Sequence, residues 1–186
     1  MRNHIRIGTR KSALALWQSE YVKSELQRLY PGVTVELVHF NTKGDRILNK
    51  PLAEVGGKGL FTAELEAAMH AGDIDIAVHS LKDMPTELPD GLTLGAISKR
   101  EVPFDALVSP KYKTLAQLPE GARIGTSSLR RQAQLLHRRP DLRIEVIRGN
   151  VQTRLGKIET EGLDGVVLAQ AGLKRLGLDD RITQVF

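Results

Sequence analysis

The chain has 186 residues, no cysteine and a formal net charge of +5. Without cysteine, these residues can form neither a disulfide nor a thiolate nucleophile nor a cysteine-ligated metal site. A hydrophobic content of 41% and a charged content of 26% are typical of a globular protein. No run approaches the roughly 18 apolar residues of a membrane-spanning helix. The first residues lack the apolar stretch of a secretory signal, so we expect a cytoplasmic protein.

Strand and helix patterns alternate along the first half of the chain. Alternating apolar residues predict a strand over 4–9. The spacing of Leu14, Trp17 and Tyr21 predicts a helix with Leu14 and Trp17 in the core, and Ser12 can cap its start. The other elements expected in this half are strands at 33–40, 74–78 and 92–97, a polar glycine-rich loop at 41–59 and a helix at 60–71.

A polar segment that ends in proline, 99–103, indicates a crossover between two domains, 1–98 and 104–186. The elements expected after the crossover are strands at 105–109, 122–126, 142–147 and 165–169, and helices that begin after Ser127 or Ser128, after Asn150 and at Gln170. Strands that alternate with helices predict an α/β protein with largely parallel sheets and helices on both faces.

Four polar turns follow predicted strands. They are Thr9 with Arg10, Ser80 to Asp83, Thr126 to Ser128, and Arg148 to Asn150. Ligands of α/β sheets bind at the carboxyl ends of strands, near helix N-termini. The four turns therefore predict one ligand-binding cleft.

Asp83 follows the apolar run 74–78 and precedes Pro85, which prevents a helix there. An aspartate at this spacing commonly caps the N–H groups of its own turn, and the spacing alone favours that structural role. The position at a strand end, where other acids are scarce, favours a functional carboxylate instead. The histidines are scattered without ligand spacing, so we expect no metal site.

Arg130 and Arg131 follow the segment GTSSL at a predicted helix start. Cations suit a helix N-terminus poorly because the helix dipole favours anions there. Serine hydroxyls, free N–H groups and two guanidiniums together favour an anion site over a solvated helical turn. Arg148 and Arg154 flank the next helix start in the same way, and Arg175 follows the last predicted strand. Many guanidiniums and one acid predict a site for a polycarboxylate.

Six segments, in this order, resemble the hydroxymethylbilane synthase family, also called the porphobilinogen deaminases. They are RIGTRKS (6–12), VGGKGLF (55–61), DIAVHSLKD (75–83), GTSSLRR (125–131), RGN (148–150) and AGLKRLG (171–177). The resemblance covers essentially the whole chain and corresponds to the N-terminal two-thirds of the family. It implies two similar doubly wound α/β domains around a cleft, as in type II periplasmic binding proteins. We expect these 186 residues to lack the family's third domain and the strand that returns to the first domain.

The resemblance also implies a transferase of tetrapyrrole and heme biosynthesis. Four porphobilinogen molecules are joined head to tail into hydroxymethylbilane, and each step releases ammonia. Asp83 matches the family's catalytic aspartate, which assists departure of the amino group and stabilises the cationic pyrrole. Lys58 and Phe61 match a mobile loop over the site. The residues that match binding positions for substrate and cofactor carboxylates are Arg10, Ser12, Ser80, Lys82, Thr126, Ser127, Ser128, Arg130, Arg131, Arg148, Gly149, Asn150, Arg154 and Arg175.

The implied cofactor is dipyrromethane, the primer of the polymerisation, which the family attaches to a cysteine of its third domain. This chain has no cysteine, so we expect it to be inactive alone. The implied partners are porphobilinogen and linear polypyrroles, without nucleic acid or membrane, and the full-length protein is expected to be monomeric. A non-catalytic carboxylate- or pyrrole-binding fragment is the alternative. A nucleic-acid-binding module is disfavoured because the basic segment lacks aromatic residues for base stacking.

Overall fold

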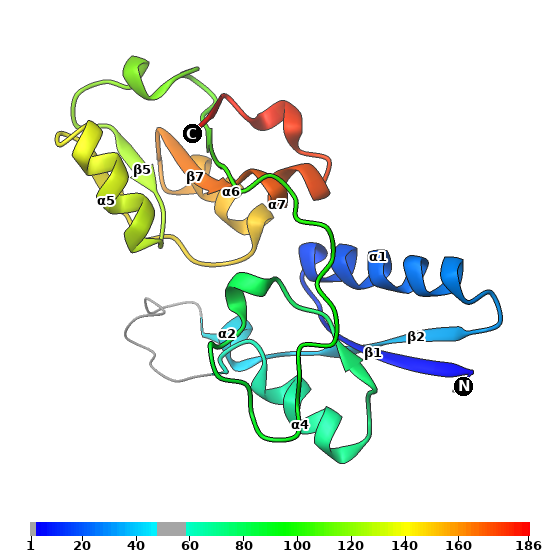
Figure 1. Ribbon diagram of the computed structural model, residues 1–186. Coiled ribbons are helices and arrows are strands. Elements are labelled where there is room, and N and C mark those ends of the chain that lie inside the picture. Colours follow the sequence, from blue (N-terminus) through cyan, green and yellow to red (C-terminus); the bar gives the residue numbers. More distant parts are fainter. Residues whose placement is uncertain (1–2, 48–58) are drawn as a thin grey trace. The chain divides into compact units, whose positions relative to one another are not determined.

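The computed structural model describes residues 3–47 and 59–186 and divides into two compact units. Unit 1 comprises the described residues up to Ser98, and unit 2 comprises Lys99–Phe186. Both units are α/β, as the alternating sequence pattern predicts (Figure 1). No helix in the described part of the chain is long and apolar enough to cross a membrane.

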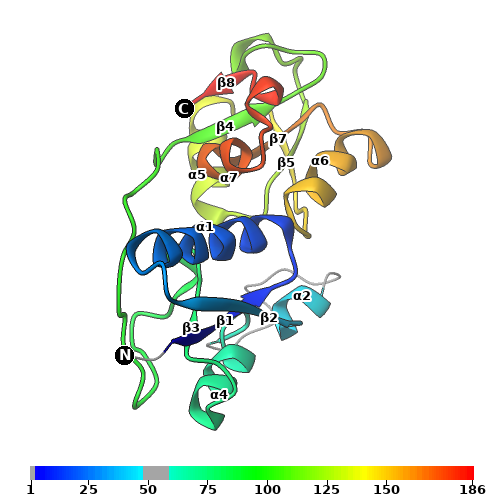
Figure 2. The same cartoon turned by 90° about the vertical axis from the view of Figure 1, so that its right-hand side faces the viewer.

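Unit 1 contains a parallel sheet of three strands in the order β2-β1-β3. The strands are β1 (His4–Arg10), β2 (Thr34–Phe40) and β3 (Ile76–Ala77), and the helical segments are α1 (Ala13–Leu29), α2 (Lys43–Arg46), α4 (Ala63–Ala71) and the 3-10 turn η1 (Leu81–Asp83). Helices α1 and α4 cover opposite faces of the sheet (Figures 1 and 2). Because β1 and β3 run parallel, their carboxyl ends share one edge, and this edge carries Arg10 and the segment Ser80 to Asp83.

A small aliphatic core joins α4 to the sheet of unit 1. Leu65, Ala68 and Ile74 are buried in it, and Phe40 packs against them. Gly8 of β1 makes this packing possible because a Cβ atom there would lie 2.3 Å from the Ile74 Cδ1 atom. The central strand β1 therefore packs directly against the side chain of Ile74, which lies just before β3.

Two sequence expectations for unit 1 need correction. Residues 92–97 form no strand, and Leu94 and Ile97 are 44% and 67% exposed, so their apolar pattern alone did not produce pairing. Trp17 is not in the core: it is 39% exposed and stacks on Tyr21 at a ring-centroid distance of 5.7 Å. The small residues Ala15 and Ser19 are the buried ones of α1, so close packing on the sheet displaces the large rings.

Unit 2 contains a mixed five-stranded sheet in the order β6-β5-β7-β4-β8. The strands are β4 (Asp105–Val108), β5 (Arg123–Gly125), β6 (Arg143–Glu145), β7 (Gly165–Ala169) and β8 (Gln184–Val185), and the helical segments are η2 (Leu115–Gln117), α5 (Leu129–Arg138), α6 (Val151–Thr160), α7 (Gln170–Arg175) and η3 (Asp179–Arg181). Strands β5, β6 and β7 are parallel, whereas β4 is antiparallel to both β7 and β8. Asp105, the first residue of β4, therefore lies opposite Ala169, the last residue of β7.

The two faces of this sheet have separate cores, as the two-residue period of a strand requires. Val166 and Leu168 of β7 point to the face covered by α6 and α7, where they pack with Leu155 and Leu173. Val167 points to the other face, which α5 covers through Leu135. Figures 1 and 2 show α5 on one side of the strands and α6 with α7 on the other.

Candidate functional site

Arg10 is held at the carboxyl end of β1 by two neighbours of unit 1. Its Nε donates to Asp45 Oδ2 at 3.0 Å, its Nη2 forms an ion pair with Asp45 Oδ1, and its guanidinium lies 4.2 Å from the centroid of the Phe61 ring. Burial would raise the pKa of Asp45, but hydrogen bonds from Arg10 and Thr42 lower it on balance, so Asp45 is ionised at neutral pH. Phe61 packs on the bare Cα of Gly44, where a Cβ would lie 2.3 Å from the ring. The cation is thus preorganised.

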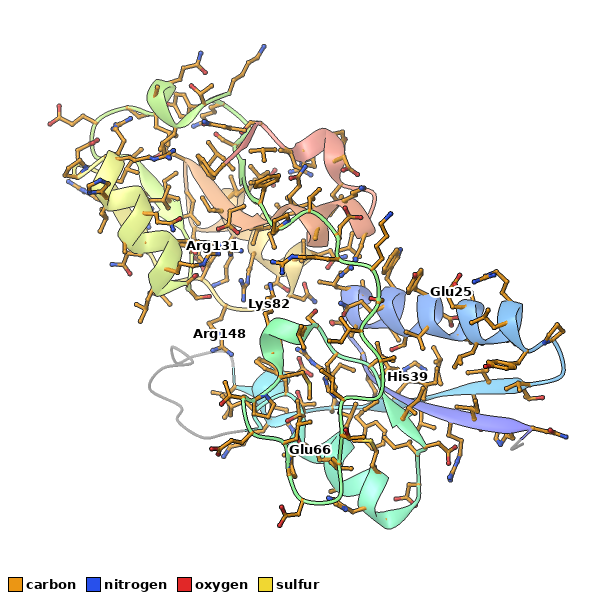
Figure 3. All side chains as sticks on the ribbon, viewed as in Figure 1. Glu25, His39, Glu66, Lys82, Arg131 and Arg148 are labelled. Atoms are coloured by element: carbon orange, nitrogen blue, oxygen red, sulfur yellow. The ribbon has the colours of Figure 1, made fainter. Side chains whose placement is uncertain are left out.

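Asp83 is presented on the η1 turn beyond β3. Its backbone N–H donates to the Ser80 carbonyl at 2.9 Å, and the Ser80 hydroxyl accepts a hydrogen bond from Gln18 Nε2 at 2.9 Å. Asp83 and Lys82 are exposed, and Figure 3 shows Lys82 on this turn. In the described part of the chain no hydrogen bond reaches the Asp83 carboxylate, unlike an aspartate that caps its own turn. The turn is held by its backbone and by α1, and the carboxylate is accessible.

His79 precedes this turn and is half-buried. Burial lowers its pKa, the positive charge of Arg10 lowers it further, and Asp83 and Glu66 oppose the shift. His79 is therefore neutral at pH 7.

The polar turn after β5 begins helix α5 of unit 2. The Ser128 hydroxyl accepts from the Arg131 backbone N–H at 3.4 Å, and the buried Thr126 hydroxyl accepts from the Ser128 N–H at 3.2 Å. Ser12 caps α1 of unit 1 in the same way, accepting from Ala15 N–H at 3.4 Å. Ser127, between Thr126 and Ser128, is half-buried. These hydroxyl groups therefore cap helices and also stabilise the turns that follow the strands.

The turn after β6 carries Arg148, Gly149 and Asn150, and Figure 3 shows Arg148 there. Gly149 has a φ of 110°, which favours glycine, and its carbonyl accepts from Arg154 Nε at 2.8 Å. Asn150 caps α6 by accepting from Thr153 N–H at 2.8 Å. Arg148 is only 6% exposed, and burial lowers its pKa. Arg154 therefore folds back onto the same turn that positions Arg148.

Arg130 and Arg131 in the first turn of α5 share one carboxylate, that of Asp105. Arg131 Nη2 donates to Asp105 Oδ1 and Arg130 Nη2 to Asp105 Oδ2, each at 2.8 Å. Arg131 Nη1 also donates to the Val167 carbonyl at 3.1 Å. No local sequence pattern marks Asp105, because only the antiparallel direction of β4 brings its first residue to this edge.

The structure thus groups the predicted site residues by unit. Arg10, Ser12, Phe61 and the Ser80 to Asp83 turn belong to unit 1. The unit 2 set is Thr126, Ser127, Ser128, Arg130, Arg131, Arg148, Gly149, Asn150 and Arg154, with the half-buried Arg175 in the last turn of α7. Lys58, predicted for a mobile loop, lies outside the described residues. Among the described residues, no three His, Asp or Glu side chains form a group that could hold a metal ion.

Solved structures with a similar fold are periplasmic-type binding proteins. The methionine binding protein MetQ matches at a TM-score of 0.56 and 20% identity, over 98% of this chain and 78% of that one. A probable amino-acid ABC transporter extracellular-binding protein from Bacillus subtilis, YtmK, matches at 0.56 and 12% identity, over 98% and 77%. The protein is therefore an α/β protein of the type II periplasmic-binding-protein fold class.

The family is established by its sequence. The model described as porphobilinogen deaminase, dipyromethane cofactor binding domain, matches residues 5–186. The chain belongs to the porphobilinogen deaminase family. Curated porphobilinogen deaminases from Syntrophotalea carbinolica and Geobacter sp. strain M21 are 63% and 62% identical over 97% of this chain. The chain spans 57% of the length of each of these two relatives.

Proposed function

We propose that this chain forms the substrate- and cofactor-binding part of a hydroxymethylbilane synthase. That enzyme joins four porphobilinogen molecules head to tail and releases one ammonia per molecule joined. The observation that carries the proposal is the accessible Asp83 carboxylate, on a turn at the same edge of unit 1 as the held guanidinium of Arg10. The high identity to porphobilinogen deaminases supports the same reaction.

In this proposal Asp83 stabilises positive charge. Loss of the aminomethyl nitrogen leaves a cationic pyrrole, and the pyrrole N–H can donate to the Asp83 carboxylate while that charge lasts. A fixed carboxylate stabilises a developing cation better than water does, because it needs no reorientation during the reaction. Arg10 is fixed by Asp45 and Phe61 and binds an acetate or propionate of the same pyrrole through its forked donors.

The arginines of unit 2 bind the carboxylates of the growing chain. Each pyrrole adds two carboxylates, so the product is a polyanion, and a single lysine or arginine would not hold it. Dipyrromethane, when bound, supplies the primer to which porphobilinogen is added, and its carboxylates fit Arg130, Arg148 and the α5 start. A covalent anchor does not fit the residues present, because the chain contains no cysteine.

A non-catalytic carboxylate- or pyrrole-binding fragment is the second candidate. The absence of cysteine from these 186 residues favours it. It assigns the same arginines and gives Asp83 no chemical role. Under either candidate we propose a cytoplasmic protein with the domains 1–98 and 104–186 joined by the crossover 99–103. For the full-length protein of the first candidate we propose a monomer.

The two candidates differ in the effect of Asp83→Asn. The chain is completed with the C-terminal region of the Syntrophotalea carbinolica relative, and porphobilinogen binding and ammonia release are measured. The synthase proposal expects unchanged binding and a loss of turnover of about 10²-fold or more. Asp90→Asn, an exposed carboxylate of unit 1, is the control and should keep both. Full turnover by Asp83→Asn would exclude the chemical role that the synthase proposal gives to Asp83.

A further inference from the structure

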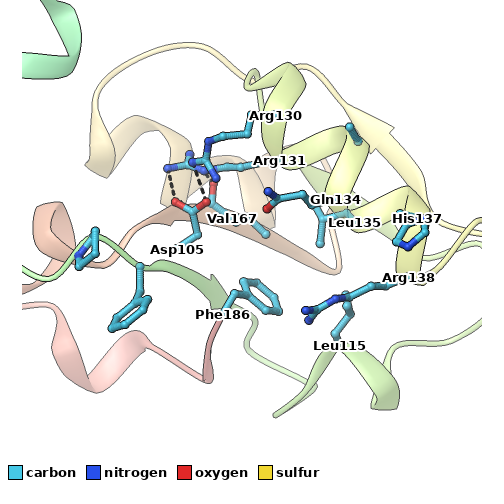
Figure 4. A pocket seen from close by; sticks show the side chains of 13 residues that line it. Asp105, Leu115, Arg130, Arg131, Gln134, Leu135, His137, Arg138, Val167 and Phe186 are labelled. Atoms are coloured by element: carbon cyan, nitrogen blue, oxygen red, sulfur yellow. Dashed lines mark hydrogen bonds and ion pairs between the residues drawn. The ribbon is translucent and has the colours of Figure 1, made fainter.

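Asp105 lies beside two arginines whose positive charges are unfavourably placed in unit 2. Arg130 and Arg131 occupy the first turn of α5, where the helix dipole is positive and two cations are unfavourable. Adjacent guanidiniums also repel each other. The antiparallel strand β4 brings the Asp105 carboxylate to both of them, and Figure 4 shows one carboxylate oxygen facing each arginine. The carboxylate offsets both effects.

The Asp105 carboxylate is ionised and largely removed from solvent. The Asp105 side chain is 11% exposed, so solvent screens its charges weakly. Burial would raise the pKa of Asp105, but hydrogen bonds and charges from Arg131 and Arg130 lower it on balance. The group is therefore an anion at neutral pH.

The two arginines differ in what Asp105 leaves them to do. The Arg131 side chain is 10% exposed, and its two terminal nitrogens donate to Asp105 and to the Val167 carbonyl of β7, so both are used inside unit 2. The Arg130 side chain is 59% exposed and uses one donor on Asp105. Arg130 also lines a cavity of about 540 Å³ (Figure 4).

We propose that Asp105 is a positioning residue: it anchors Arg131 within the sheet and fixes the Arg130 guanidinium so that its remaining donors bind a ligand carboxylate. The inference rests on the proposed function, since it names how one of the binding arginines is oriented. A guanidinium fixed on one side loses less side-chain entropy when it binds a carboxylate on the other. Removal of Asp105 should therefore weaken the ligand although Asp105 does not touch it.

The test is calorimetric titration of porphobilinogen into the 186-residue chain and its variants. We expect Asp105→Asn to weaken binding about tenfold, Arg130→Gln to weaken it at least as much, and Asp105→Glu to recover part of the loss. Asp141→Asn is the matched control. Asp141 pairs with Arg139 at 2.7 Å at the other end of α5, so this variant loses an ion pair that involves neither Arg130 nor Arg131.

A second readout needs no ligand. In the parent chain, ¹⁵N NMR of the guanidinium groups should show slow rotation of Arg130 and Arg131, and Asp105→Asn should make rotation fast for Arg130. The proposal is overturned if Arg130→Gln weakens binding while Asp105→Asn does not, or if the Arg130 signals do not change. If the parent chain itself does not bind porphobilinogen, the proposed function fails instead, and the NMR result still decides the role of Asp105.

Discussion

Arg6 and Asp75 join the first and third strands of unit 1 through a single carboxylate. Asp75 Oδ2 accepts from the Arg6 backbone N–H at 2.8 Å and from its Nε at 3.2 Å, and Oδ1 accepts from its Nη2 at 3.1 Å. The Asp75 N–H returns a bond to the Arg6 carbonyl at 2.9 Å. This pair stabilises the register in which β3 pairs with β1, and β3 leads to the turn that carries Asp83.

We therefore expect Asp75→Ala to loosen the Asp83 turn. The variant removes the acceptor of a backbone N–H and of two guanidinium donors, and unmade bonds of this kind are costly. It should lower the melting temperature by about 2–6 °C and speed amide hydrogen exchange over 75–84. Asp73→Ala, an exposed neighbour, is the control. Equal exchange in both variants would show that the pair does not set this register.

Arg131 and Arg130 should differ in their contribution to stability. Arg131→Met leaves Asp105 and the Val167 carbonyl without a buried partner and should cost about 3 kcal/mol. Arg130→Met removes an exposed guanidinium and should cost less than about 1 kcal/mol. The single tryptophan lies in unit 1, so hydrogen exchange of β4 and β7 is the measurement that reports unit 2. Comparable losses would contradict the assignment of Arg131 as the anchor.

Gly165 and Gly156 provide a matched pair of alanine substitutions. A Cβ at Gly165 in β7 would lie 2.9 Å from the backbone carbonyl oxygen of Val108, which cannot move without breaking the strand pairing. Gly165→Ala should cost about 1–3 kcal/mol. Gly156 of α6 is exposed, and a Cβ there meets nothing within 4 Å, so Gly156→Ala should stabilise by about 0.5–1 kcal/mol. Urea denaturation followed by circular dichroism measures both.

Asp141 should make stability depend on acid pH. The hydrogen bond from Arg139 lowers its pKa from 3.8 to about 2, against the opposing effect of burial. Between these values the unfolded chain binds more protons than the folded one, so the free energy of unfolding rises with pH. The contribution of Asp141 is complete above 3.8 and is lost as the pH falls toward about 2.

The variant Asp141→Asn isolates this effect from that of other acids, such as Asp45, whose pKa is also lowered. Its free energy of unfolding should rise less steeply with pH than that of the parent chain between about pH 2 and pH 4. Urea denaturation at several pH values gives both slopes. Parallel curves would mean that Asp141 is not held by Arg139 in solution.

Local patterns predicted most helices and the central strands but not how the strands pair. The N-caps Ser12 and Asn150 follow from the residue type and the helical spacing after it, and both are confirmed. Of the two serines predicted for the start of α5, Ser128 is the cap. The antiparallel direction of β4 depends on contacts with β7 and β8, far along the chain, and no local pattern contains it. This is why the arginines were found in the sequence and Asp105 was not.

The three N-caps have a consequence for what a ligand must bring. The hydroxyl oxygens of Ser12 and Ser128 each accept a hydrogen bond from a backbone N–H, and the side-chain carbonyl oxygen of Asn150 accepts one from the Thr153 N–H. The groups that remain to bind a ligand are hydrogen-bond donors, namely two hydroxyl groups and one amide NH2 group. In the proposed function, these donors and the arginines of the same turns favour a ligand that carries hydrogen-bond acceptors. An ionised carboxylate can accept hydrogen bonds from such donors. A protonated acid or an ammonium group instead carries hydrogen-bond donors of its own, which find no acceptor among these groups.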